Sequence, residues 1–210
     1  PEVLERLGRG EDVALVSDAG TPCISDPGYR LVSAVVAARF RVSPVPGPSA
    51  VATALSVSGL PTAAFAFEGF LPRRRAARRK LLLALADEPR TLVFLESPQR
   101  IGESLAEMAD VFGPARRAFV GRELTKLHEE LTHGPLAEIA DRFDGATPRG
   151  ELVVVVEGAA PTHAATPEAV LARFDELRAD GVAERDAMRQ AAKEHGLSRR
   201  DVYRIVKLET

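Results

Sequence analysis

Two loops rich in glycine, proline and hydroxyl side chains have the residue types that bind small ligands. The first, residues 17–28, reads SDAGTPCISDPG and follows the apolar run DVALVS at 12–17. The second, PGPS at 46–49, follows RVSPV at 41–45 and opens a helix rich in alanine and valine. Glycine lets a ligand approach the backbone closely, and in open α/β sheets ligands bind where strands end. Together the two loops favour a ligand site.

Each loop also has a purely structural interpretation. Ser49 could cap the helix that follows it, and both loops contain residues typical of tight turns. Neither loop matches GxGxxG or GxxxxGK[ST], so a Rossmann dinucleotide site and a P-loop lose their main support. Cys23 in the first loop is interpreted as a small packed residue. Because it is the single cysteine of the chain, a disulfide framework and a multi-cysteine zinc site are excluded.

Acidic side chains stand where three apolar runs end, at Glu68, Glu96 and Glu123. If they project into a common cleft, Glu96 or Glu123 could act as a general base or hold a polar group of a substrate. Salt bridges to Arg100 or Arg122 are the structural alternative for these carboxylates. The four histidines have no metal-ligand spacing, so no metal site is predicted.

Basic residues are concentrated in residues 73–80, RRRAARRK. Like charges without acidic partners repel one another, which favours an anionic partner over a solvated helix face. Residues 184–208 read as helix, tight turn, helix, with Ser198 and Asp201 forming a capping box, which resembles a helix-turn-helix. A small helical bundle packing on the main body is the alternative. The candidate contacts to a nucleic-acid phosphate backbone are Arg73, Arg74, Arg75, Arg78, Arg79, Lys80, Arg199, Arg200 and Arg204.

Apolar runs and helical periodicity alternate along the first 156 residues, which predicts α/β layers with sheets covered on both faces. Strands are predicted at 12–17, 41–45, 63–68, 91–96, 117–122 and 151–156. Helices are predicted at 2–8, 29–39, from 50 to about 58, 74–86, 99–112 and 135–143, and then, in a purely helical tail, at 167–179, 183–195 and 199–208. Breaks in the pattern divide the chain into domains at 1–60, 61–160 and 161–210.

Composition excludes several classes of protein. Of 210 residues, 45% are hydrophobic and 28% charged, which is typical of a globular chain and not of a disordered or collagen-like one. No apolar run approaches the about 20 residues that cross a bilayer. The net charge of −2 gives no bulk attraction to nucleic acid, so any such binding needs a local patch. The sequence has no signal peptide, which predicts the cytoplasm.

Six motifs then occur in a specific order: SDAGTPCISDPG at 17–28, PVPGPSA at 44–50, FEGFLPR at 67–73, FLESPQR at 94–100, GRELTKLHEE at 121–130 and RGELVVVVEG at 149–158. They resemble the bacterial 16S ribosomal RNA (cytidine-2′-O)-methyltransferase family. That family belongs to the tetrapyrrole-methylase-like, class III enzymes that use S-adenosylmethionine (SAM). The resemblance covers residues 3–158, and the helical tail resembles that family's C-terminal domain weakly.

The resemblance implies two α/β domains of the tetrapyrrole-methylase type with SAM between them, a small C-terminal helical domain, and a homodimer that acts on ribosomal RNA or the small subunit. Relative to the family, the first domain is truncated by about 70 residues, about half of a typical α/β domain, which would leave its first strand without partners. The residues expected to line the cofactor pocket are Ser17, Asp18, Ala19, Gly20, Thr21, Ser25, Asp26, Pro46, Gly47, Pro48, Ser49, Ala50 and Leu95.

Methyl transfer to a ribose hydroxyl is an in-line displacement, so holding donor carbon and acceptor oxygen about 3 Å apart is the main requirement. A nearby base or hydrogen-bond acceptor should assist the hydroxyl, and Glu96 or Glu123 could do this. Lys126 could instead orient a phosphate of the acceptor, and the sequence does not choose between them. Two other functions stay open. One is a class III methyltransferase that acts on a tetrapyrrole or another small acceptor. The other is a non-enzymatic nucleic-acid-binding module built around the helix-turn-helix.

Overall fold

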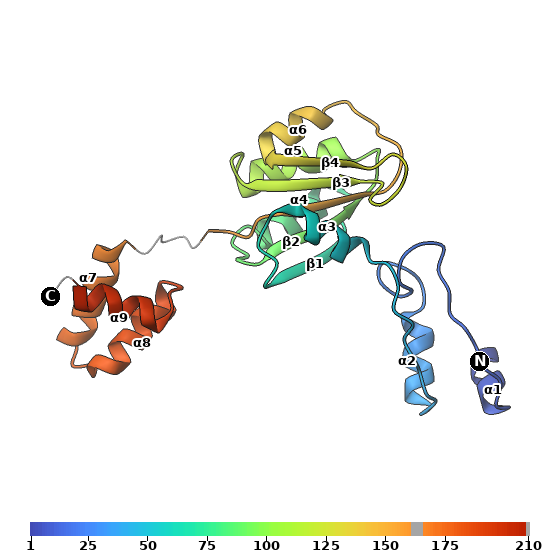
Figure 1. The fold of residues 1–210 in the computed structure, drawn as a ribbon, viewed down its shortest axis with the longest axis horizontal. Helices are drawn as coiled ribbons and strands as arrows, with labels where there is room; N and C mark the ends of the chain where they lie inside the picture. The colour runs from blue at the N-terminus through green and yellow to red at the C-terminus, as the bar shows by residue number, and fades with distance from the viewer. Residues whose placement is uncertain (161–165, 209–210) are drawn as a thin grey trace. The chain divides into compact units, whose positions relative to one another are not determined.

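A mixed five-stranded sheet organises the first of two units, which comprises Pro1–Ala86 and Arg90–Glu157 (Figure 1). The structure is a computed structural model that describes residues 1–160 and 166–208. The strand order is β1-β2-β5-β3-β4, with β1 parallel to β2 and every other neighbouring pair antiparallel. The strands are β1 (Phe65–Phe70), β2 (Thr91–Glu96), β3 (Arg117–Arg122), β4 (Glu130–Pro135) and β5 (Leu152–Val156).

This register gathers several chain segments at one end of the sheet. Glu96 pairs with Leu152, and Leu152 pairs in turn with Arg122. The carboxyl ends of β1, β2 and β3 therefore lie together with the first residues of β4 and β5. We call this end of the sheet the carboxyl edge. The strand ends that the sequence singled out share it.

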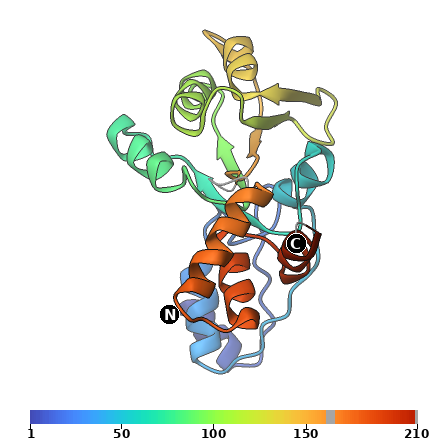
Figure 2. The same cartoon turned by 90° about the vertical axis from the view of Figure 1, so that its left-hand side faces the viewer.

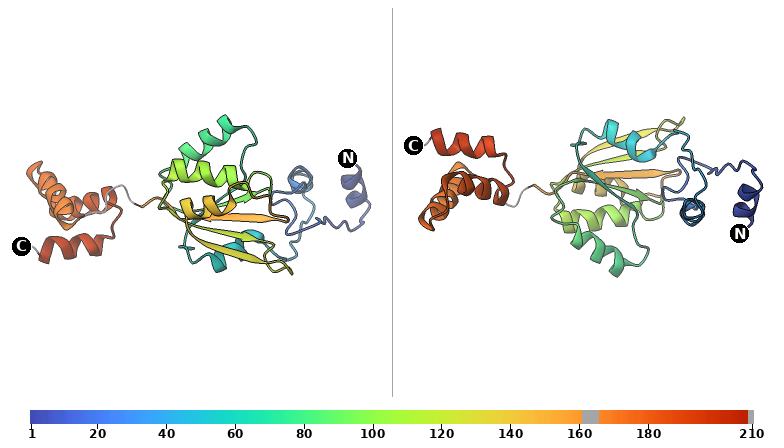
Figure 3. Two further views of the ribbon diagram at one scale, coloured as in Figure 1. Left: turned by 90° about the horizontal axis from the view of Figure 1, so that it is seen from above. Right: turned by 90° about the horizontal axis from the view of Figure 1, so that it is seen from below.

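Alternate strand residues face two separate cores, because successive side chains of a strand point to opposite faces. Leu92, Phe94 and Val154 pack in the core formed with α4 (Arg75–Ala84), α5 (Ile101–Phe112) and α6 (Leu136–Phe143). Val93, Phe119, Val153 and Val155 pack instead with α3 (Ala50–Ser58) and Leu60. Helices thus cover both faces (Figure 3), which explains why the central strands read as unbroken apolar runs.

The segment before α3 has no strand among its described residues, so the predicted strands at 12–17 and 41–45 were wrong. Val16 is 80% exposed and Val45 is 86% exposed. The helices predicted around them do form, as α1 (Glu2–Gly8) and α2 (Tyr29–Ala37). A helix satisfies its own backbone groups, whereas a strand needs a neighbour, and no described segment pairs with these two runs.

The sheet also contains a strand that the sequence analysis missed, β4. Its sequence, ELTHGP, is polar, and of its six residues Thr132 alone is buried. It forms because its backbone pairs with β3 along the full length of that strand, from Glu130 opposite Arg122 to Pro135 opposite Arg117. The remaining strands and helices of this unit lie within about two residues of their predicted bounds.

The second unit comprises Asp87–Pro89 and Gly158–Thr210 and contains α7 (Pro167–Ala179), α8 (Glu184–Glu194) and α9 (Arg199–Leu208), drawn orange to red in Figure 2. All three helices were predicted. Their core is separate and includes Val170, Phe174, Met188 and Val202. The N-cap half of the predicted capping box is confirmed, since the Ser198 hydroxyl accepts a bond from the Asp201 backbone N–H at 3.2 Å. Among residues 1–160 and 166–208, no helix is long and apolar enough to cross a membrane.

Candidate active site at the carboxyl edge of the sheet

The loop between β3 and β4 holds an unusual backbone conformation at the carboxyl edge. Glu123 and Thr125 have φ angles of 48° and 66°, a region that side chains other than glycine rarely adopt and that is least favourable for a β-branched residue such as threonine. The Thr125 backbone N–H donates to the Glu129 carboxylate at 2.6 Å, and the Lys126 N–H donates to the Glu123 carbonyl at 2.9 Å. Strained backbone that is held in place by several surrounding contacts is concentrated at functional sites.

Glu123 and Lys126 of this loop form one charged cluster with Glu151, which directly precedes β5. Lys126 Nζ lies 2.9 Å from Glu123 Oε1 and 3.0 Å from Glu151 Oε2, and the Glu151 backbone N–H donates to Glu123 Oε1 at 2.9 Å. That backbone hydrogen bond and then Lys126 hold the pKa of the Glu123 carboxyl below its usual range. The two carboxylates raise the pKa of Lys126. Glu123 and Lys126 are therefore both charged at neutral pH.

Gly150 makes the position of the Glu123 side chain possible. A Cβ atom on residue 150 would lie 2.5 Å from the carboxylate carbon of Glu123, closer than real contacts allow. Gly150 also has a φ of +102°, which favours glycine. Gly150, Glu151, Thr125 and Glu129 were not among the site residues predicted from the sequence. The one available signal was their position inside the GRELTKLHEE and RGELVVVVEG motifs.

Glu96 reaches the same edge but is buried and fully bonded. Its Oε2 accepts from the Ser104 hydroxyl at 2.7 Å, and its Oε1 accepts from the Ser97 backbone N–H at 2.7 Å. Arg100 Nη2 lies 2.6 Å from the same Oε1. The predicted alternative, a salt bridge to Arg100, is thus confirmed. The carboxylate ties the end of β2 to the start of α5.

The other strand-end partners are arranged differently from the prediction. Arg122 pairs with Glu130 at 3.0 Å and not with Glu123. Arg142 also contacts Glu130 at 2.6 Å, and the two arginines, Arg122 first, lower the pKa of the Glu130 carboxyl. Glu68 is half-buried at an irregularity in β1. Of the three strand-end carboxylates, Glu123 is the one bonded to a partly exposed lysine.

The structure brings the two ligand loops together. The Thr21 hydroxyl of the first loop donates to the Pro48 carbonyl of the second at 3.1 Å. A Cβ atom on Gly69 of β1 would lie 3.5 Å from the Ser25 hydroxyl, so the first loop also reaches the carboxyl edge. Leu95, the next-to-last residue of β2, is half-buried beside α3. The predicted cofactor residues therefore adjoin the end of β1.

Several hydroxyls in these loops have local partners. The Ser17 hydroxyl donates to the Ala19 carbonyl at 3.0 Å, and the Ser49 hydroxyl accepts from the Ala52 backbone N–H at 3.4 Å. The helix-cap interpretation of Ser49 is thus confirmed. The remaining predicted cofactor residues are exposed or half-buried within the two loops and the first turn of α3: Asp18, Gly20, Asp26, Pro46, Gly47 and Ala50.

The basic run at 73–80 is not a uniform surface, which corrects the prediction for Arg78. Arg78 is buried, and its guanidinium contacts the Glu107 and Glu103 carboxylates of α5. Arg79 lies 2.6 Å from Asp110 of the same helix. The acidic partners that the local sequence lacks are thus supplied by α5. The exposed residues of the run that form no ion pair within residues 1–160 and 166–208 are Arg73, Arg74, Arg75 and Lys80. On α9, Arg199, Arg200 and Arg204 are exposed.

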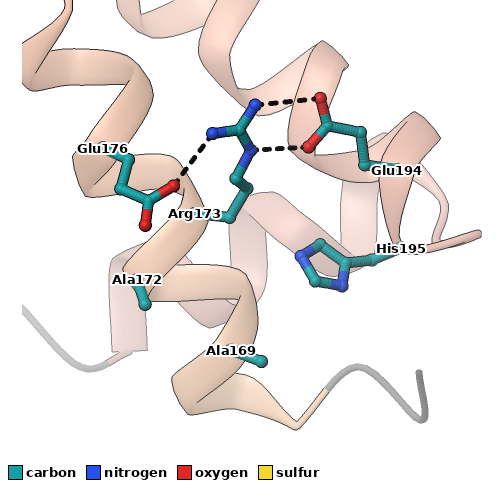
Figure 4. A pocket seen from close by; sticks show the side chains of 6 residues that line it. All are labelled: Ala169, Ala172, Arg173, Glu176, Glu194 and His195. Carbon is teal, nitrogen blue, oxygen red and sulfur yellow. Dashed lines mark hydrogen bonds and ion pairs between the residues drawn. The ribbon is translucent and has the colours of Figure 1, made fainter.

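Two shallow pockets lie away from these residues. The larger, about 410 Å³, lies between α7 and α8, where Arg173 bridges Glu176 and Glu194 (Figure 4). Arg173 and then Gln190 lower the pKa of Glu194 to about 2. The smaller, about 280 Å³, is lined by residues that include Ser58, Arg117 and His133, at the opposite end of the sheet. Neither pocket contains a predicted catalytic, cofactor or RNA residue.

Known proteins resemble this chain strongly. The sequence model of the family described as Tetrapyrrole (Corrin/Porphyrin) Methylases matches residues 2–140. The "Ribosomal RNA small subunit methyltransferase I" of Mycobacterium tuberculosis (strain CDC 1551 / Oshkosh) is 48% identical over 205 residues, 97% of this chain and 71% of that protein. The protein of the same name from Pseudomonas aeruginosa is 55% identical over 157 residues, 74% of this chain and 56% of that protein.

Solved structures share the fold at lower sequence identity. The crystal structure of the methyltransferase CobJ superposes with a TM-score of 0.57 at 22% identity, covering 77% of this chain and 71% of that one. The uroporphyrin-III C-methyl transferase from Thermus thermophilus, complexed with S-adenyl homocysteine, gives a TM-score of 0.50 at 20% identity, covering 73% and 70%. These two similarities concern the fold alone.

Proposed function

Because this chain belongs to the tetrapyrrole methylase family, and within it to the ribosomal RNA small subunit methyltransferase I family, we propose that it methylates small-subunit ribosomal RNA with SAM at the 2′-hydroxyl of a cytidine. The observation that carries the proposal is the arrangement at the carboxyl edge. There the Glu123–Lys126–Glu151 cluster and the start of the basic run adjoin strands that end side by side, and the first ligand loop reaches the same edge beside Gly69 of β1.

The residues at this edge fit SAM, which supplies an electrophilic methyl group on a sulfonium when it is bound. Its amino-acid and ribose groups need carboxylate and hydroxyl partners, and Asp18, Asp26 and Ser25 offer both types on the first loop. Gly47 has no atom within 4 Å of a Cβ placed on it, so the second loop presents open backbone to a ligand. Thr21 ties this loop to the first one.

Glu123 is proposed to orient the acceptor hydroxyl. Since its pKa lies below the usual range, it stays an anionic hydrogen-bond acceptor and is a weak proton acceptor. Lys126 is 47% exposed at its side chain and is proposed to hold a phosphate of the acceptor RNA. Glu96 is proposed as a positioning group, because Ser104, Ser97 and Arg100 already use its oxygens. Positioning of this kind is the main catalytic requirement of the transfer.

The RNA is proposed to lie against Arg73, Arg74 and Arg75, which follow the end of β1 within a few residues. Their exposure and their position after a strand that ends at the carboxyl edge support this assignment. Lys80, Arg79 and the exposed α9 arginines Arg199, Arg200 and Arg204 are proposed as further phosphate contacts. Arg78 is left out of this surface because it is buried against Glu107.

The direct test measures incorporation of labelled methyl groups from SAM into small ribosomal subunits. Glu123→Gln is expected to lower turnover by about 10²-fold, as for a misplaced acceptor hydroxyl, while calorimetry still detects S-adenosylhomocysteine binding. Glu138→Gln, which alters an exposed carboxylate on α6, is the matched control and should leave turnover unchanged. Label that enters small molecules and not ribosomal RNA would show that the acceptor is wrong.

Three further statements belong to the same proposal. The chain acts as a homodimer, which light scattering would test by measuring twice the chain mass. It acts in the cytoplasm, because its substrate is the ribosomal subunit assembled there. Its domains divide at 1–60, 61–160 and 161–210, with α3 and Leu60 packed at the contact between the first two, which lie in one compact unit. Limited proteolysis near residues 60 and 160 would test this division.

A further inference from the structure

Helix α3 connects the second ligand loop to the far end of the sheet. The helix begins directly after the loop, with Ser49 as its N-cap. Its nine residues span about 14 Å at 1.5 Å per residue. It buries Ala54 and Leu55 against Val93, Phe119 and Val155. Any shift of the helix therefore moves the loop.

The hydrophobic contacts of α3 leave its position only partly determined. A nine-residue helix is too short to be stable by itself in water, so packing must hold it. Ala54 and Leu55 are its two buried apolar side chains, and the half-buried Val51 is the further apolar residue of the helix packed on this core, so the contact area is small. Apolar contacts are also non-directional and permit sliding. Directional contacts at the end of the helix are needed to set its position along the sheet.

Two side chains from the sheet supply such contacts. The ring of His133, on β4, donates from Nε2 to the Val57 carbonyl at 2.9 Å. Arg117, the first residue of β3, donates from Nη2 to the Gly59 carbonyl at 3.1 Å. These carbonyls belong to the last turn and the left-handed cap of α3. Backbone carbonyls there lack partners within the helix, and this end of the helix carries the negative partial charge of the helix dipole.

Both side chains are themselves held in place. The His133 ring lies 4.8 Å from the Phe119 ring, centroid to centroid, and the two residues are paired across β3 and β4. Arg117 Nη1 lies 3.4 Å from Glu157 Oε1. The donors therefore have a defined position relative to the sheet, and through them the C-terminal end of α3 acquires one.

We propose that Arg117 and His133 are positioning residues for SAM binding: by clamping the C-terminal end of α3 they set the position of the PGPS loop at its other end. The bond from Thr21 to Pro48 extends this control to the first ligand loop. The inference rests on the proposed function, because it assumes that the PGPS loop binds the cofactor. Neither residue contacts the reacting groups.

The test compares three variants of the 210-residue chain. The double variant Arg117→Ala, His133→Ala removes both donors, and the double variant Arg117→Lys, His133→Gln keeps a donor at each site. Arg178→Ala is the matched control, since Arg178 Nη1 also donates to a backbone carbonyl, that of Val182 at 2.7 Å, but in the other unit. Hydrogen exchange of residues 50–58 and calorimetric binding of S-adenosylhomocysteine are measured for each.

We expect the double alanine variant to exchange the α3 amides about tenfold faster and to bind S-adenosylhomocysteine about tenfold more weakly, as for the loss of two hydrogen bonds of ordinary net strength. The Lys/Gln variant should recover most of both effects, and the control should show neither. A circular dichroism spectrum like that of the wild type excludes general unfolding.

The outcomes separate the two claims. If the wild-type chain binds S-adenosylhomocysteine and the double alanine variant binds it equally well, the inference is wrong and the proposed function stands. If the wild-type chain does not bind it, the proposed function fails, and the exchange rates alone decide whether Arg117 and His133 hold α3. Unchanged exchange in the double alanine variant overturns the clamp in either case.

Discussion

Residues 12–17 and β5 have similar sequences and opposite structures. DVALVS is without regular structure and Val16 is 80% exposed. In β5, LVVVV, every residue is buried, between β2 on one side and β3 on the other. Both runs have the apolar, β-branched composition of a buried strand. The difference shows that such a run forms a strand only where other segments satisfy its backbone and cover its faces.

The same lesson applies to charged residues. Arg74 and Arg78 stand four positions apart in one basic run, yet Arg74 is exposed and Arg78 is buried between the carboxylates of α5. The neighbouring residues in the sequence do not distinguish these two arginines. What distinguishes them is a helix that begins more than twenty residues later along the chain.

The largest expected effect comes from placing the same charge in the two apolar runs. Val154→Asp puts a carboxylate where the side chain has no exposure, and we expect it to destabilise the sheet unit by more than about 4 kcal/mol, enough to unfold it. Val16→Asp should change the free energy of unfolding by no more than about 0.5 kcal/mol. Urea denaturation followed by circular dichroism measures both. Equal losses would mean that residues 12–17 are packed after all.

The second prediction divides the basic run. Arg78→Ala leaves Glu107 buried without its partner and should cost about 3 kcal/mol of stability. Arg74→Ala should change the free energy of unfolding by no more than about 0.5 kcal/mol. It should reduce the slope of the logarithm of the RNA-binding constant against the logarithm of the salt concentration by about one, because one phosphate contact is lost. Denaturation and RNA titration at several salt concentrations provide the two measurements. A stable Arg78→Ala variant with weakened RNA binding would return Arg78 to the RNA surface.

The third prediction concerns two glycines with positive φ in the same unit. Gly145 has a φ of +63° and nothing within 4 Å of a Cβ placed on it, whereas Gly150 has the Glu123 carboxylate there. Both alanine variants carry backbone strain, about 1 kcal/mol. Gly150→Ala alone should displace Glu123 and lower methyl transfer about tenfold, as for a misplaced positioning group. Equal activities in the two variants would argue against a role for the Glu123 position.

The smallest effect lies in the C-terminal unit, where Arg173 lowers the pKa of Glu194 to about 2. A depressed folded-state pKa stabilises the unit above the unfolded value of 4.5, and this contribution is lost as pH falls from there towards 2. Arg173→Gln should raise the Glu194 pKa towards 4.5 and remove that part of the acid dependence. An NMR titration of Glu194 measures it. A titration near 4.5 in the wild type would mean that the exposed ion pair is screened.

Much of this protein followed from its sequence. Helices α7, α8 and α9, the capping box at Ser198 and the apolar strands β2, β3 and β5 were predicted, because helical hydrogen bonds and hydrophobic periodicity are local properties. The six motifs predicted the methyltransferase family, which the 48% identical relative confirms. The residues of both ligand loops were also named from sequence, and their role stays a prediction.

Tertiary structure decided the rest, because the deciding contacts join residues far apart in the chain. Whether 12–17 forms a strand depends on neighbouring segments, and the polar strand β4 exists because β3 pairs with it. Arg78 is buried by a carboxylate 29 positions away. Glu123 is held by the backbone of Glu151, 28 positions away. Sequence patterns describe what a residue is able to do, and only folded neighbours determine which of those possibilities its backbone and side chain adopt.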